Sequence, residues 1–170
     1  VGSEMCIRDR YRCLSKTIFS ASSLLKILND EICETTSRGM FVTMIVGVYD
    51  KNKNELLLSN AGHEPPLIFS KDGNFKTIDE AGPPLGIAPN FKFAEQIISF
   101  KESSMYIFTD GITEMKNNNG EMLGQEGFQD YIKKYQTTPN NKRLQKMIED
   151  LISSGRIQKD DLTIVTVDGN

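Results

Sequence analysis

The length, composition and charge of this chain are those of an ordinary globular domain. Its 170 residues are 38% hydrophobic and 25% charged, and the formal net charge is −3. This composition excludes a disordered segment, and the length allows one domain with a core of its own. The mixed charges and the lack of long basic runs argue against nucleic acid and an anionic membrane surface as partners. No apolar stretch of the sequence reaches the length needed to span a bilayer.

The first ten residues, VGSEMCIRDR, differ in character from the rest of the chain. They open on Val, show neither strand nor helix periodicity, and resemble a translated adapter tail left at the end of a reading frame. We therefore assign residues 1–10 to a non-native tail and exclude them from the fold. Residues 11–170 are expected to be the C-terminal part of a single domain whose N-terminal region is missing. The cysteines have no disulfide-type or metal-type spacing, which favours the cytoplasm.

A helix followed by a hairpin is predicted for the first part of the chain. Residues 19–36 have an apolar face at helical spacing, with Ser22 or Ser23 as candidate caps. From Met40 the pattern becomes β-branched and apolar. Strands are predicted in FVTMIVGVYD (41–50) and ELLLSNAG (55–62), joined by a polar turn.

Further strands and two helices complete the predicted order. Strands are predicted in residues 66–70, 75–78, 91–100 and 104–110, helices in 124–135 and 141–153, and a last strand in 160–168. Short connections favour antiparallel sheet with helices packed on it over a parallel βαβ fold. No glycine-rich nucleotide-binding motif is present, which agrees. The predicted fold class is therefore α+β.

Carboxylates stand at the ends of two predicted strands. Asp110 ends one apolar strand, and Asp160 and Asp161 begin another. If these strands are antiparallel neighbours, the carboxylates converge, and like charges that close repel unless a cation lies between them. Hard oxygen ligands of this kind suit Mg²⁺ or Mn²⁺. The spacing alone favours the alternative, in which Asp110-Gly111 is a common turn pair and Asp160-Asp161 is a solvated loop end.

His63 is the only histidine, so a Ser-His-Asp or Cys-His site would have to use it. No cysteine lies near it in the sequence, and there is no G-x-S-x-G motif. A single histidine in a Gly-His-Glu-Pro-Pro loop is more often structural than catalytic. A hydrolase triad is therefore disfavoured.

Five motifs follow one another along the chain: FVTMIVGVYD, NAGHEPPLI (60–68), GPPLGI (82–87), FTDGITEMKNNNGEMLG (108–124) and DDLTIVTV (160–167). In this order they resemble the PPM-type Ser/Thr phosphatases, in particular the bacterial SpoIIE-like branch. The resemblance covers the chain from about Leu24 to Val167, and its most specific part is the TDGITE element with a downstream DDLT. It implies a four-layer α-β-β-α sandwich, with two mainly antiparallel sheets flanked by helices, incomplete at the N-terminus.

The resemblance also implies roles for individual residues. Asp110 and Asp160 match metal-binding aspartates, and Asp161 is a weaker match for a ligand of the same two Mn²⁺ or Mg²⁺ ions. The implied nucleophile is a water held by these ions and not a side chain. Gly111 would let the backbone turn sharply beside the metals. The remaining matches are assigned to shaping loops: Glu114, Asn117, Gly120 and His63.

Relatives carry further metal aspartates in N-terminal GD-x-x-D and DVSGHG type elements, and neither element is found in this chain. We therefore expect the parent protein to be a metal-dependent protein serine/threonine phosphatase, and this chain alone to bind metal poorly and turn over little. The resemblance implies a phosphorylated regulatory protein, such as an anti-sigma antagonist, as substrate, and a sensor or receiver domain upstream.

Two alternatives remain open on the sequence. One is a non-catalytic phosphatase-like module that binds a signalling phosphoprotein. The other is an unrelated α+β binding domain whose aspartates are ordinary turn residues.

Overall fold

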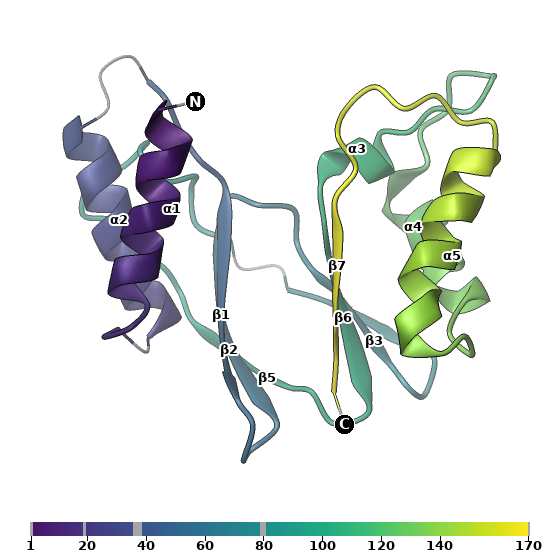
Figure 1. Ribbon diagram of the computed structural model, residues 1–170, viewed down its shortest axis with the longest axis horizontal. Helices are drawn as coiled ribbons and strands as arrows, with labels where there is room; N and C mark the ends of the chain where they lie inside the picture. The colour runs from purple at the N-terminus through teal and green to yellow at the C-terminus, as the bar shows by residue number, and fades with distance from the viewer. Residues whose placement is uncertain (1, 19, 36–38, 79–80, 170) are drawn as a thin grey trace. The chain divides into compact units, whose positions relative to one another are not determined.

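A computed structural model describes residues 2–18, 20–35, 39–78 and 81–169 (Figure 1). The described residues form five helices: α1 (Gly2–Leu14), α2 (Ala21–Thr35), α3 (Asp110–Thr113), α4 (Gly124–Lys134) and α5 (Asn140–Ser153). They also form seven strands: β1 (Met44–Asp50), β2 (Glu55–Ala61), β3 (Leu67–Ser70), β4 (Phe75–Thr77), β5 (Gln96–Ser99), β6 (Ser103–Phe108) and β7 (Ile164–Asp168). No helix among these residues has the length and apolar character needed to cross a bilayer.

The strands pair into two antiparallel sheets, in the orders β1-β2-β5 and β4-β3-β6-β7. The chain divides into two compact units that follow the sheets. The first unit, residues 1–65 and 78–101, holds the first sheet with α1 and α2. The second unit, residues 66–77 and 102–170, holds the second sheet with α3, α4 and α5. The predicted α+β fold of antiparallel sheets with helices is confirmed.

Helix α2 supplies much of the core of the first unit. Its apolar residues recur at helical spacing, so Leu24, Leu28 and Ile32 are all buried in one cluster with residues of β1 and β2. The cap differs from the prediction: Ser20 Oγ accepts a hydrogen bond from Ser23 N at 3.2 Å. Neither candidate cap serves, because the helix begins at Ala21 and both serines already lie inside it.

The predicted hairpin is confirmed as β1 and β2. Its register runs from Met44 opposite Ala61 to Asp50 opposite Glu55. The turn is fixed by the Asp50 carboxylate, which accepts hydrogen bonds from the backbone N–H groups of Asn52 at 2.9 Å and Lys53 at 3.2 Å. A side chain that satisfies turn amides in this way explains why the polar run after β1 reverses the chain.

The N-terminal segment differs from the expectation that it lacks regular structure. Helix α1 runs from Gly2 to Leu14, and its Ile7, Tyr11 and Leu14 pack against the core of the first unit. These residues are spaced by four and three positions, which places them on one face of a helix. A helical conformation does not show where these residues come from. The assignment of residues 1–10 to an adapter tail therefore stays a prediction.

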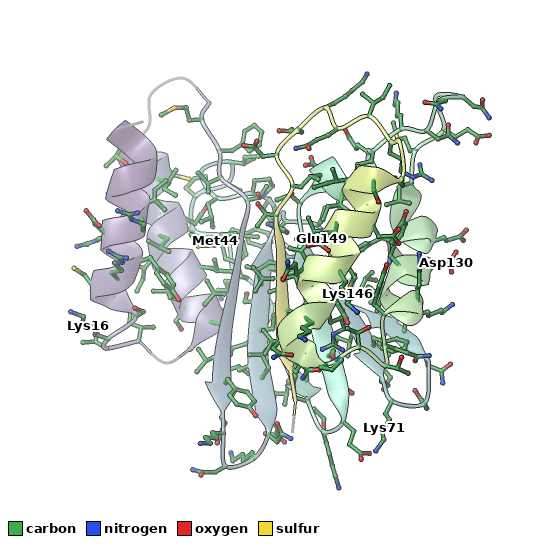
Figure 2. All side chains as sticks on the ribbon, turned by 45° about the vertical axis from the view of Figure 1, so that its right-hand side comes forward. Lys16, Met44, Lys71, Asp130, Lys146 and Glu149 are labelled. Atoms are coloured by element: carbon green, nitrogen blue, oxygen red, sulfur yellow. The ribbon has the colours of Figure 1, made fainter. Side chains whose placement is uncertain are left out.

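The core of the second unit lies between its sheet and helices α4 and α5, which Figure 1 shows packed against that sheet. Tyr106 and Phe108 of β6 contribute to it from the sheet, and Phe128 of α4 and Met147 of α5 from the helices. All four residues are at most 2% exposed. Asp130 of α4 and Lys146 and Glu149 of α5 lie on the exposed faces of these helices (Figure 2).

Several strands are shorter than predicted. Strand β5 covers only Gln96–Ser99, because Phe91 and Phe93 pack edge to face in the core of the first unit and do not continue the sheet. Strand β6 ends at Phe108, and β7 begins at Ile164. Asp110 and Gly111 instead begin the helical turn α3, and Asp160 and Asp161 lie in a loop, as expected because Asp and Gly are poor strand formers.

Candidate functional site

Strands β6 and β7 bring the predicted aspartate segments together at one end of the second sheet. Their antiparallel pairing sets Phe108 opposite Ile164, so the chain that leaves β6 runs beside the chain that enters β7. Just beyond this pair, Thr109 N donates to the Thr163 carbonyl oxygen at 3.1 Å. Asp110 opens α3 rather than ending the strand, and Asp160 and Asp161 lie in the loop before β7.

Gly111 lies against the backbone of the opposite segment. A Cβ atom at this position would stand 2.5 Å from the carbonyl oxygen of Asp161 and 3.5 Å from the carbonyl carbon of Asp160. The first distance is too short for any side chain, so the close approach requires glycine. Gly111 is not among the glycines with a positive φ. Its observed contribution is therefore close packing and not a left-handed turn.

All three aspartates are exposed. Asp161 N donates to Asp160 Oδ1 at 2.7 Å, and Gln158 Nε2 donates to the Asp160 carbonyl oxygen at 2.9 Å. Within the described part of the chain, none of the ion pairs involves Asp110, Asp160 or Asp161. Since exposed carboxylates stay hydrated, the cost of burying a charge at a strand end does not arise. The three groups are open to a cation from solution.

The donor chemistry of this segment suits a hard divalent cation. Carboxylate oxygens are the ligands that Mg²⁺ and Mn²⁺ prefer, and Mg²⁺ is commonly held by one or two carboxylates with several waters. The residues that the structure describes do not gather three or more Asp, Glu, His or Cys side chains into one metal-binding group. The second unit therefore fits part of a metal site.

The loop after α3 is built around Asn117. Its Oδ1 accepts hydrogen bonds from the backbone N–H groups of Asn119 and Glu121, both at 3.0 Å, and its Nδ2 donates to Glu121 Oε2 at 2.8 Å. Gly120 has φ +83°, which side chains rarely adopt. Glu114 closes α3 by donating its backbone N–H to the Asp110 carbonyl at 2.8 Å, while its carboxylate is exposed. These contacts agree with roles in shaping the loop.

His63 belongs to the first unit and is held by Asn60. Asn60 Oδ1 accepts from His63 N at 2.9 Å, and Asn60 Nδ2 donates to the His63 carbonyl at 2.9 Å. The ring Nδ1 lies 3.1 Å from the Glu64 carbonyl oxygen. Asn60 is only 2% exposed. The contacts of His63 are thus local backbone contacts, which support a structural role for its loop.

Sequence reasoning did not single out Thr109, which joins the two aspartate segments. Thr109 Oγ1 donates to the Asp161 carbonyl at 3.0 Å and accepts from Thr163 N at 3.1 Å. The sequence predicts Thr109 to lie inside a strand, whereas in the structure it precedes α3, a position where threonine commonly caps. Its side chain makes no cap hydrogen bond to α3. Only the pairing of β6 with β7 reveals its partner.

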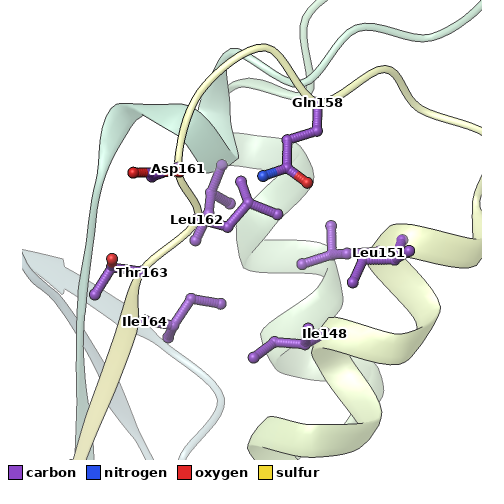
Figure 3. Close-up of a pocket in the computed structure, with 9 residues that line it drawn as sticks. Ile148, Leu151, Gln158, Asp161, Leu162, Thr163 and Ile164 are labelled. Carbon is purple, nitrogen blue, oxygen red and sulfur yellow. The ribbon is translucent and has the colours of Figure 1, made fainter.

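A groove of about 430 Å³ lies beside the loop that contains Asp161 (Figure 3). Figure 3 shows Ile148 and Leu151 of α5 on one side and Leu162 and Ile164 on the other. The lining is completed by Ile112, Ile152, Gln158, Asp161 and Thr163. Asp161 therefore belongs to the edge of a mostly aliphatic groove, and Figure 3 shows its side chain pointing away from the aliphatic residues.

A buried polar cluster ties α5 to β7 in the same unit. Arg143, which is 5% exposed, forms an ion pair with Asp168 and donates to Asn140 Oδ1 at 2.9 Å. Ser104 Oγ donates to Asp168 Oδ1 at 2.5 Å. Burial raises the pKa of Tyr106, whose ring lies 5.9 Å from the Arg143 guanidinium and whose hydroxyl has no hydrogen-bond partner within the described structure. Arg143 and Tyr106 are buried, whereas Asn140 is exposed, so this structural cluster reaches from the core to the surface.

The two antiparallel sheets with their helices have the fold of PP2C-type phosphatase domains, the class also called PPM. The solved SiaA-PP2C domain of Pseudomonas aeruginosa superposes with a TM-score of 0.83 over 98% of this chain and 68% of that chain. The sequence identity is 14%, so this similarity concerns the fold. Residues 5–169 match the family of stage II sporulation protein E. The chain belongs to the SpoIIE family.

Two curated relatives are longer than this chain. Protein IcfG of Synechocystis sp. is 29% identical over 181 residues, covering 96% of this chain and 28% of the relative. The phosphoserine phosphatase RsbU of Bacillus subtilis is 27% identical over 157 residues, covering 91% of this chain and 47% of the relative. The chain thus spans less than half the length of each relative.

Proposed function

We propose that the protein containing this chain is a metal-dependent phosphatase that hydrolyses phosphoserine or phosphothreonine on a regulatory protein. The observation that carries the proposal is the antiparallel pairing of β6 with β7, which sets the Asp110 segment against the Asp160-Asp161 segment. Membership of the SpoIIE family and similarity to a phosphoserine phosphatase support the reaction.

The residues of this chain would hold a cation rather than attack the substrate. Asp110 and Asp160 would supply carboxylate oxygens, with Asp161 as a further candidate ligand. A bound Mn²⁺ or Mg²⁺ would make water a better nucleophile and screen the charge of the phosphoryl oxygens. Gly111 lets the two segments approach, and Asn117 and Gly120 fix the loop after α3.

The substrate is proposed to be a phosphorylated signalling protein of the anti-sigma antagonist type, and a sensor or receiver domain upstream is proposed to control the reaction. The similarity to the phosphoserine phosphatase RsbU supports a phosphoserine substrate, whereas the type of signalling protein and the upstream domain rest on the motif resemblance. A location in the cytoplasm stays a prediction from the cysteine pattern.

The decisive test uses this chain extended by its upstream sequence, with a phosphoserine peptide and Mn²⁺. Removing hydrogen-bond partners of metal ligands typically costs about 10–100-fold, so Asp110→Ala, which removes a ligand, should lower kcat/KM by more than about 100-fold. The matched control is Asp130→Ala, an exposed carboxylate of α4, which should leave the rate unchanged. Equal turnover by the wild type and Asp110→Ala would refute the proposed site.

The 170-residue chain alone is proposed to turn over little, because its described residues supply only part of a ligand set. The check is hydrolysis of a generic phosphate ester by the purified chain with Mn²⁺. Substantial hydrolysis that disappears in Asp110→Ala would contradict this expectation.

The same partial ligand set favours a second candidate, a phosphatase-like module that binds a phosphoprotein without hydrolysing it. This candidate predicts that the extended protein retains a phosphoserine peptide intact in the presence of Mn²⁺. Its affinity for the peptide would not depend on Asp110. Release of inorganic phosphate would exclude it.

A further inference from the structure

We propose that Thr109 is a positioning residue that fixes the separation between the two aspartate-bearing segments. The inference rests on the proposed function, because it concerns how the same carboxylates are held. Thr109 lies between Phe108, the last residue of β6, and Asp110, the first residue of α3.

Thr109 makes three hydrogen bonds to residues 161–163, in the segment that leads into β7. Its backbone N–H donates to the Thr163 carbonyl at 3.1 Å, as in a normal ladder. Its hydroxyl then donates to the Asp161 carbonyl at 3.0 Å and accepts from Thr163 N at 3.1 Å. A hydroxyl can do both because it carries one donor and two acceptor lone pairs. The side chain therefore extends the ladder past the last backbone pair, Phe108 and Ile164.

The hydroxyl is not used as an ordinary helix cap. Thr109 has the extended backbone expected of a cap residue, with φ −91° and ψ 156°, yet its side chain makes no cap hydrogen bond to α3. A threonine in this position usually accepts a hydrogen bond from the second or third helical N–H. Here the hydroxyl instead donates to the Asp161 carbonyl and accepts from the Thr163 N–H.

The carbonyl that receives the hydroxyl is also the one that touches Gly111. The Asp161 oxygen lies 2.5 Å from the place of a Cβ on Gly111, so it is held between Thr109 and Gly111. Fixing this carbonyl fixes the peptide plane that follows Asp161, and with it the path of Asp160 and Asp161 past Asp110. Mg²⁺ requires oxygen ligands at about 2.1 Å in near-octahedral geometry, so small shifts between the segments would weaken a shared ion.

The hydrogen bonds of the Thr109 hydroxyl are tested first, without metal, on the 170-residue chain. Thr109→Val removes the hydroxyl and keeps the shape, and Thr109→Ser keeps the hydroxyl. Thr163 N–H exchange, followed by NMR, should be roughly fivefold faster in Thr109→Val, as for the loss of one typical hydrogen bond, and near wild type in Thr109→Ser. Thr77→Val, an exposed residue of β4 at the other edge of the sheet, is the matched control. Thr109→Ala replaces Thr109→Val if the latter fails to fold.

The positioning role is tested by making the same variants in the chain extended by its upstream sequence, titrating them with Mn²⁺ and following paramagnetic broadening of the Gly111 and Asp161 amide resonances. Thr109→Val should need roughly tenfold more Mn²⁺ than the wild type for equal broadening, as when a ligand's hydrogen-bond partner is lost. Thr109→Ser should need about the same amount as the wild type.

The outcomes separate this inference from the proposed function. If Thr163 N–H exchange were unchanged in Thr109→Val, the stabilising hydrogen bond between Thr163 and the Thr109 hydroxyl would be refuted. Faster exchange with an unchanged Mn²⁺ requirement would overturn the positioning role and leave the proposed site standing. No local broadening in any protein, the wild type included, would overturn the metal site of the proposed function and the positioning role with it, even where the exchange result holds.

Discussion

The two units of this chain treat their polar side chains differently. In the first unit, Asn29 and Asn60 are at most 2% exposed, and both bond to the backbone of neighbouring loops. In the second unit, Asp110, Asp160 and Asp161 are exposed. A buried amide whose oxygen and nitrogen are both hydrogen-bonded fixes structure, whereas exposed carboxylates on facing segments are accessible to a ligand. The contrast shows which polar residues serve the fold and which are available for chemistry.

The second unit adds a comparison within itself. The buried Arg143 of α5 forms an ion pair with the partly buried Asp168 of β7. Breaking a buried pair leaves an uncompensated charge, so such residues resist substitution for reasons of stability. Asp160 and Asp161, in the loop before β7, take part in none of the ion pairs of the described residues. Substitutions of these two residues should therefore change ligand binding more than folding.

Among substitutions outside the aspartates, the largest loss of activity is expected for Gly111→Ala. The added Cβ would meet the Asp161 carbonyl, a backbone atom that cannot move aside cheaply, and overpacking of this kind costs about 1–3 kcal/mol. A displacement of about 1 Å at a reacting site can cost about 100-fold in rate, so phosphatase activity of the extended protein should fall on that order.

The matched control is Gly47→Ala in the first unit, where the added Cβ would meet only the movable Leu56 side chain, at 3.1 Å. Urea denaturation and kcat/KM measured on both variants check the contrast. If the two variants behaved alike, the close approach at Gly111 would have no special importance.

An effect on stability and not on activity is expected for Asn29→Ala, which should destabilise the chain without changing the segments that carry Asp110, Asp160 and Asp161. Asn29 Nδ2 donates to the Ala88 carbonyl at 2.8 Å, and its Oδ1 accepts from Gly86 N at 3.0 Å. Losing these bonds leaves two backbone groups without partners, at a cost of about 1–3 kcal/mol each where they stay buried. The urea midpoint should fall in Asn29→Ala and stay constant in Asn118→Ala, an exposed residue. Mn²⁺-dependent broadening near Gly111 should not change; a change would break the proposed division of roles.

The smallest effect is expected for Tyr106→Phe, which removes a buried hydroxyl that has no partner within the described structure. At neutral pH the free energy of unfolding should change by no more than about 1 kcal/mol, because no hydrogen bond is lost. Burial raises the pKa of Tyr106, with Asp168 acting in the same direction and Arg143 against it. The folded state therefore favours the protonated phenol.

That stabilisation is complete below the ordinary tyrosine pKa of about 10 and is lost as the pH rises through the higher pKa of the folded state. Urea denaturation at about pH 8 and about pH 11 should show a steeper loss of stability in the wild type than in Tyr106→Phe. Equal losses in the two proteins would mean that Tyr106 does not titrate in this range.

Much of the fold could be predicted from local patterns. The helical spacing of Leu24, Leu28 and Ile32 predicts α2, and the polar turn after Asp50 predicts the β1–β2 hairpin. These features depend on residues close in sequence, where periodicity and turn chemistry act directly. The boundaries were less accurate, as at β5, because Phe91 and Phe93 are drawn into a core that includes residues far away in the sequence.

The acidic residues of the candidate site could be predicted, but their setting could not. The order of five motifs indicates the phosphatase class and singles out Asp110 and Asp160. The sequence alone favoured a buried strand ending in a carboxylate. The structure instead has Asp110 exposed at the start of a short helical turn.

The sequence by itself determined the class of the chain, its antiparallel elements and the residue types of its acidic segment, because these depend on composition, period and motif order. The tertiary structure decided which segments meet. Thr109 and Asp161 are 52 residues apart, and their hydrogen bond exists only because β6 pairs with β7 in one register. The need for glycine at position 111 has the same origin, since a carbonyl from the opposite segment fills the space that a side chain would take.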